Sequence, residues 1–212
     1  MWALIKNNKI EQIYQRPKSL LIGEVRYPSN MFTKYTDAEK AAIGIYPVED
    51  NGTKGNDRFE NTSQATYSFS ASDKKVTTSY TITAKSLVDV NDVDSDGNAV
   101  LDYKGNQTVT LGLKSIAKNQ AKETANYLIK RFNWLVERQA YDSSATIPSV
   151  VGTYVGDIKT DCAAIEAAID GASDMAAFKA LYEDTRDSDG NVTEVARINR
   201  WSDDYDVKQY VR

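Results

Sequence analysis

Three aspartates near the middle of the chain come closest to a known ligand pattern. Asp92, Asp94 and Asp96 occupy positions one, three and five of a calcium-binding loop. Gly97 follows where such a loop bends, but Tyr103 stands at position twelve, where a bidentate glutamate is needed. The flanking residues also have the pattern of strands rather than helices. We therefore interpret the segment as a β-hairpin tip with solvated carboxylates and keep the three aspartates as a weak candidate cation site.

Catalytic chemistry has little support in the residue types. The chain has no histidine, which excludes Ser-His and Cys-His dyads and imidazole-ligated zinc. The single cysteine, Cys162, lies in an Ala/Ile-rich helical stretch and is expected to be a small buried hydrophobe. No phosphate-binding loop, dinucleotide fingerprint or Cys-x-x-Cys pair is present. We expect no enzyme activity, no catalytic residues and no cofactor.

Composition narrows the class of protein further. The 212 residues are 41% hydrophobic and 26% charged, which is typical of a folded chain rather than a disordered one. The net charge of −4 argues against nucleic-acid binding, because such surfaces concentrate basic residues. No apolar run approaches the length of a membrane span, and Lys6 and Lys9 interrupt the first one. We expect a soluble protein made in the cytoplasm, with neither a nucleic acid nor a membrane as its partner.

The elements of the first 110 residues are strands and one short helix. Alternation over residues 2–5, followed by Asn7-Asn8, predicts a β-hairpin. Thr36 and Glu39 form a capping box that predicts a short helix ending at about Ile43, before Gly44.

The clearest strand patterns follow a polar loop over residues 49–63. Residues 67–71 and 76–84 alternate apolar with Ser/Thr positions, and the second run predicts one strand of about nine residues. One face of this sheet is then apolar and the other is coated with hydroxyl groups.

Helical spacing replaces this alternation at Leu111. One apolar stripe predicts a long helix that ends near residues 139–141, and a second predicts a helix from Pro148 to Gly171. Two helices joined by a short linker pack antiparallel, and a third, shorter helix carries Phe178. The predicted fold is α+β: an antiparallel β-rich part over residues 1–110, a helical hairpin with a short third helix over 111–182, and a polar C-terminal tail segment over 183–212.

Several blocks of the chain resemble proteins of tailed bacteriophages, namely uncharacterised structural or tail-fibre-associated proteins. The helical half is similar to a region shared by phage tail assembly chaperones and tail-fibre proteins, in which a Trp-centred helix precedes an Ile-Pro linker and an alanine-rich helix. The resemblance implies a phage protein and supplies no catalytic residues. The blocks that carry it are residues 1–48, 90–102, 109–115, 133–138, 145–148 and 178–182.

The function expected from this resemblance is assembly. We expect a virion component of the tail or baseplate, such as a fibre, adaptor or accessory protein, whose partners are other tail proteins and copies of itself. Trp2 and Leu4 are candidates for an edge that accepts another strand, and Thr77, Ser79 and Thr81 for a contact face. The sequence favours neither a core position nor an interface position for Trp201.

Two alternatives remain at this point. One is a non-virion chaperone that masks tail or fibre subunits before they polymerise. The other is a carbohydrate-binding or carbohydrate-processing module, which would need a cleft lined by carboxylates and aromatic rings.

Overall fold

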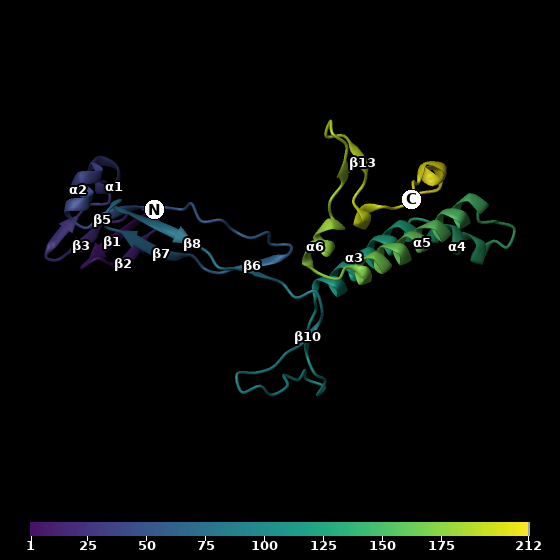
Figure 1. The fold of residues 1–212 in the computed structure, drawn as a ribbon. Helices are drawn as coiled ribbons and strands as arrows, with labels where there is room; N and C mark the ends of the chain where they lie inside the picture. The colour runs from purple at the N-terminus through teal and green to yellow at the C-terminus, as the bar shows by residue number, and fades with distance from the viewer. Residues whose placement is uncertain (212) are drawn as a thin grey trace. The chain divides into compact units, whose positions relative to one another are not determined.

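The computed structural model describes residues 1–211, and its chain divides into two compact units (Figure 1). The first unit covers Met1–Ala84 and is built mainly of strands, whereas the second begins at Lys85 and is built mainly of helices. The predicted α+β class is therefore confirmed. The boundary expected at residue 110 falls inside the second unit, because residues 90–110 form a separate ribbon that does not join the sheet.

A five-stranded sheet forms the body of the first unit. Its strand order is β2-β1-β5-β8-β7, with every neighbouring pair antiparallel except β5 and β8. The predicted first hairpin is confirmed, because Asn7 and Asn8 take φ angles of 52° and 59° in the turn between β1 and β2. The outer strands β2 and β7 also lie close to each other. The strands of the sheet are β1 (Trp2–Lys6), β2 (Lys9–Tyr14), β5 (Ile45–Glu49), β7 (Thr66–Ser70) and β8 (Lys75–Ser79).

Smaller elements of the first unit lie between β2 and β5. They are the hairpin of β3 (Leu20–Ile22) and β4 (Val25–Tyr27), and the helices α1 (Met31–Lys34) and α2 (Asp37–Ala42). The capping box of α2 is formed as predicted: Glu39 N–H donates to Thr36 Oγ1, and Thr36 N–H donates to the Glu39 carboxylate at 2.7 Å. Gly44 ends the turn after α2 with a φ of 81°.

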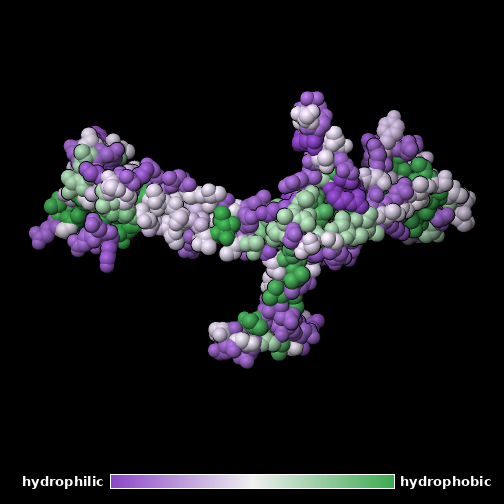
Figure 2. Space-filling view, in the orientation of Figure 1, coloured by the Kyte–Doolittle hydropathy of each residue, from purple (hydrophilic) through white to green (hydrophobic). Residues whose placement is uncertain are grey.

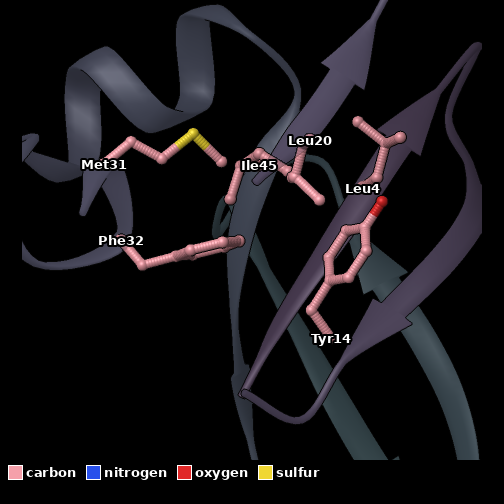
Figure 3. Packing of buried hydrophobic residues seen from close by; sticks show 6 residues of the cluster. All are labelled: Leu4, Tyr14, Leu20, Met31, Phe32 and Ile45. Carbon is pink, nitrogen blue, oxygen red and sulfur yellow. The ribbon is translucent and has the colours of Figure 1, made fainter. Parts of the chain in front are cut away.

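Two clusters of apolar side chains lie against the sheet. The first joins β1, β2 and β5 to the β3 strand and helix α1 (Figure 3). The Phe32 ring of this cluster packs near the rings of Trp2 and Tyr14. The buried members of the cluster are Leu4, Tyr14, Leu20, Met31, Phe32 and Ile45. The second cluster is built around Ala3, Val48 and Val76. Because both clusters draw on β1 and β5, these two strands form the centre of the unit.

The strand expected over residues 76–84 is interrupted, which corrects the prediction. β8 ends at Ser79, and β9 (Ile82–Ala84) pairs with β6 (Glu60–Thr62) in a separate ribbon. The hydroxyl groups of Thr78 and Tyr80 both donate to Asp50 Oδ1, at 2.7 and 2.9 Å. These bonds hold Thr78 and Tyr80 against the loop after β5. The alternation of apolar and polar residues therefore continues past Ser79, but β8 and β9 pair with different strands.

The second unit is centred on two antiparallel helices. Lys118 and Lys122 of α3 (Leu113–Lys130) pair with Asp170 and Glu166 of α5 (Ser149–Gly171), at 2.9 and 3.4 Å. α3 contributes small residues to the contact, and α5 contributes larger ones such as Ile158 and Ile165. The predicted helical hairpin is confirmed, and α6 (Met175–Ala180), capped by the Asp174 carboxylate, is the expected third helix.

The first predicted helix is two helices in the structure. α3 ends at Lys130, and α4 (Asn133–Tyr141) begins after Phe132, whose φ of −108° and ψ of 0° leave the helical region. Phe132 is buried, and its ring meets that of Tyr154 edge-on at 5.7 Å. The side chain of Arg131 bonds Tyr154 and Asp204, both distant in sequence. Tertiary contacts at this point therefore override the helical periodicity.

The C-terminal segment is part of the second unit rather than a polar tail, which corrects the boundary drawn at residue 183. It contains β12 (Thr185–Arg186), β13 (Val192–Glu194), and the 3-10 helices η1 (Arg197–Asn199) and η2 (Tyr205–Tyr210), of which η1 and η2 contact α5. Trp134 Nε1 donates to the carbonyl of Tyr210 at 2.9 Å, and Val207 is almost fully buried. Polar residues dominate this segment, but its few apolar side chains and backbone groups attach it to the helices.

Candidate functional site

The three aspartates of the calcium-like pattern do not converge on one point. Asp94 Oδ1 accepts the backbone N–H groups of Asp96 and Asn98 at 2.9 Å, and Asp92 Oδ1 accepts the hydroxyl of Thr110 at 2.6 Å. The carboxylates are thus used to hold turns and strands. Within residues 1–211 no group of three or more acidic or cysteine side chains is placed to hold a metal ion. The structure accordingly favours the hairpin-tip interpretation over a cation site.

The same turn occurs three times, with the pattern Asp-x-x-Gly-Asn. In each copy the aspartate carboxylate accepts two backbone N–H groups and the side-chain amide of the asparagine, and the glycine has a φ of 83° or 84°. Bonds from the asparagine hold the pKa of each aspartate below its ordinary value. Two copies share the sequence DSDGN, and the third has Tyr103 and Lys104 in its middle. The turns span residues 94–98, 102–106 and 187–191.

Two of these turns close the tips of a projecting element, which we call the acidic arm (residues 88–111). Its stem is a two-stranded ribbon of β10 (Val90–Asn91) and β11 (Val109–Thr110) (Figure 1). Beyond the stem, single bridges continue into two short loops, and Gln107 Nε2 donates to the carbonyl of Asp92 at 2.6 Å between them. The arm is therefore an ordered element with hydrogen bonds of its own.

The root of the arm is fixed to the start of α3. Gly112 N–H donates to Asp89 Oδ1 at 2.7 Å, and Leu113 N–H donates to the carbonyl of Ser86 at 2.9 Å. A Cβ atom at Gly112 would collide with the backbone of Val88. The close crossing of the two chain segments thus requires glycine, and it sets the direction in which the arm leaves the helices.

Exposed large apolar residues are concentrated in the arm. Tyr103 is 91% exposed, Val88 64% and Leu101 56%. Figure 2 shows apolar residues along the arm in green. In the stem Val90 and Val109 lie on opposite faces, because Val90 is paired with Thr110 and Val109 with Asn91. The exposed large apolar residues of the arm are Val88, Val90, Val93, Val100, Leu101, Tyr103, Val109 and Leu111.

Such a ribbon cannot bury its own apolar side chains. A two-stranded ribbon alone is marginally stable in water and needs a third strand or another packed element. No third strand pairs with β10 or β11 among residues 1–211. Clustered exposed apolar residues of this kind mark interaction sites.

The arm also carries a concentrated negative charge. It holds five aspartates and one lysine, Lys104, so its formal net charge is −4. Within the described chain, none of the five carboxylates forms an ion pair with a lysine or arginine. The surface is thus both apolar and acidic.

The first unit carries the opposite charge on five side chains, which we call the basic face: Lys6 and Lys9 beside the β1–β2 turn, Arg16 and Lys18 after the end of β2, and Arg26 in β4. All five side chains are exposed, and none forms an ion pair with a carboxylate among residues 1–211. Lys6 and Leu21 line a hollow of about 630 Å³ between the β1–β2 and β3–β4 hairpins. Leu21 and Val25 of the second hairpin are 65% and 54% exposed.

The strand edge expected at Trp2 and Leu4 is wrong. β1 is paired with β2 on one side and β5 on the other, so it has no free edge. Leu4 is buried in the core (Figure 3). The centre of the Trp2 ring lies 4.7 Å from that of the Phe32 ring.

The other interface candidates do not form a single surface. Thr77 lies in β8, which is paired on both sides, and is partly buried. Ser79 and Thr81 are exposed, but they lie on either side of the break between β8 and β9. Trp201 is partly buried between η1 and η2, in the segment attached to α5.

Cys162 is buried, as its sequence context predicts. Burial raises the pKa of its thiol, and Glu166, whose carboxylate lies 3.5 Å away, raises that pKa further. A thiol in this state is a poor nucleophile.

One open hollow is lined by Asp37, Glu49 and Asp73 beside Tyr46, but Glu49 is engaged by Lys75 at 2.9 Å.

Comparison of the chain with protein-family models, with curated proteins and with solved structures finds no match. Among the described residues, no helix has the length and apolar character that crossing a membrane requires. The acidic arm and the basic face are therefore the features on which a functional proposal must be built.

Proposed function

We propose that this protein is a structural component of a bacteriophage particle, in the tail or baseplate, and that it acts by binding other subunits. The observation that carries the proposal is the acidic arm, whose exposed apolar side chains have no partner strand among residues 1–211. The resemblance of several sequence blocks to phage tail-associated proteins supplies the setting. Its partners are then other tail or baseplate proteins and copies of itself.

The arm suits assembly better than chemistry. Four of its five carboxylates accept hydrogen bonds from backbone amides or a hydroxyl group, so they are positioned to hold the chain rather than to bind a substrate. Its exposed valine, leucine and tyrosine side chains gain most when another protein removes them from water. An assembly subunit would bury this surface permanently, and a chaperone would bury it transiently.

Quantitative mass spectrometry of purified particles tests the proposal. A fixed, stoichiometric number of copies per particle supports a virion component. Presence in the infected-cell lysate but absence from particles supports the non-virion chaperone and contradicts the proposal. Hydrolysis of a glycan by the isolated protein would contradict both.

A matched pair of phage variants tests the role of the arm. Tyr103→Ser removes a side chain that is 91% exposed on the arm, and Tyr141→Ser removes one that is 93% exposed at the end of α4. We expect the first variant to lower incorporation into particles and the second to leave it unchanged. Equal incorporation of both variants would show that the arm is not the binding surface.

A further inference from the structure

We propose that the acidic arm of one copy binds the basic face of a second copy, so that copies join head to tail. The inference rests on the proposed function as an assembly protein and names the partner of the arm. It follows from charge and from apolar surface, which are taken in turn.

The two surfaces have complementary charges that neither satisfies by itself. The arm has a formal net charge of −4, whereas residues 1–34 hold six basic and two acidic residues, a net charge of +4. Neither the arm carboxylates nor the five basic-face side chains form ion pairs within residues 1–211. Complementary charges of this kind steer association and select the partner. Two arms would instead repel each other, because each brings an excess of carboxylates.

The two surfaces also match in apolar character. Leu101 and Tyr103 project from the arm, and Leu21 and Val25 project from the hairpin beside the basic face. The hollow next to Leu21 is bordered by Ile5 and Ile22 as well as by Lys6. The lining also includes Glu11, so the hollow matches the arm by its apolar contact and not by a positive charge of its own.

Because the arm and the basic face are different surfaces, their contact is heterologous. Each bound pair leaves one arm and one basic face free, so association continues into longer chains or closes into a ring. Mixing a chain whose arm is defective with a chain whose basic face is defective distinguishes this arrangement from a symmetric dimer.

Sedimentation velocity of the full chain over a concentration series tests the contact. At about 50 mM salt we expect the mean sedimentation coefficient to rise with concentration, and at about 500 mM we expect that rise to be much smaller. Arg16→Glu/Arg26→Glu should weaken association about tenfold. The control Lys130→Glu/Lys159→Glu, with the same charge change on exposed residues of the helices, should associate like the unaltered protein.

A mixing experiment tests the head-to-tail arrangement itself. Leu101→Lys/Tyr103→Lys disables the arm, and Val136→Lys/Tyr141→Lys is its control on α4, with closely matched exposure. An arm-defective chain mixed with a face-defective chain keeps one working contact, so we expect dimers and nothing longer. Circular dichroism and thermal unfolding of each variant verify that it is folded.

The proposal is overturned by a monomer at every concentration, by association that the arm or face variants leave unchanged, or by a mixture that forms no dimers. Carbodiimide cross-linking of mixed ¹⁴N and ¹⁵N chains gives a second readout. Cross-links that join Asp96 of a chain with one isotope to Lys9 or Lys18 of a chain with the other isotope support the proposal. Cross-links that occur only within one chain contradict it. If the head-to-tail contact is refuted but purified particles contain the protein, the proposed function still holds. The contact and the function are therefore tested separately.

Discussion

Asp161 Oδ2 accepts two hydrogen bonds from Ser202, one from its backbone N–H and one from its hydroxyl, both at 2.7 Å. The two residues are 41 positions apart, and the pair fixes the C-terminal segment to the middle of α5. Arg131 makes a second attachment through Asp204 at 3.0 Å.

Asp161→Ala should loosen the C-terminal segment while leaving the helical hairpin folded. Loss of the paired acceptor is expected to cost about 1–3 kcal/mol, because the Ser202 donors lose their partner. Hydrogen exchange followed by mass spectrometry should show faster exchange over residues 197–210 and unchanged exchange in α3. Asp157→Ala, at an exposed position one turn earlier on α5, is the control. Equal exchange in both variants would mean that the Asp161–Ser202 pair does not hold the segment.

Gly44→Ala should destabilise the first unit more than Gly23→Ala. Both glycines have positive φ angles, 81° and 62°, so both substitutions cost about 1–2 kcal/mol from backbone strain. A Cβ at Gly44 would also lie 2.6 Å from the carbonyl oxygen of Ile5, whereas nothing lies within 4 Å of one at Gly23. Thermal unfolding followed by circular dichroism measures the difference. Equal losses of stability in the two variants would show that the Ile5 carbonyl does not lie as close to Gly44 as described.

The Asp-x-x-Gly-Asn turns should lose stability as the pH falls. The pKa values of Asp94, Asp102 and Asp187 are lowered in the folded chain, chiefly by hydrogen bonds from the asparagine of each turn. Their stabilising effect is therefore complete above the ordinary aspartate pKa of about 3.9 and is lost as the pH falls through the lower folded value.

Carboxyl titration by NMR checks this pH dependence. Each of the three carboxyl carbons in the folded protein should titrate at a lower pH than in an unstructured peptide with the same turn sequence. Titration at the same pH in protein and peptide would contradict the hydrogen bonding described for the turns.

Features set by neighbouring residues could be predicted from the sequence. The capping box needs only Thr36 and Glu39 three positions apart, and the first hairpin needs only residues that tolerate positive φ at Asn7 and Asn8. The hairpin tip at Gly97 is predictable for the same reason. The turn that begins at Asp102 makes the same hydrogen bonds, although its two middle residues are Tyr103 and Lys104.

Features set by distant residues could not be predicted in this way. Trp2 and Leu4 belong to a central strand because β5, about forty residues later, pairs with β1. The break between α3 and α4 depends on Arg131, which reaches Asp204. The acidic arm has an ordinary strand pattern, and only its exposure and its lack of a third strand identify it as a surface for a partner.

A density map of the intact phage particle tests the central claim most directly, since that claim is that another subunit covers the acidic arm. We predict density for this chain at a fixed position in the tail or baseplate, with residues 88–111 in contact with a neighbouring subunit. A particle in which the chain is present but its arm stands free in solvent would contradict the account, as would a particle that lacks the chain.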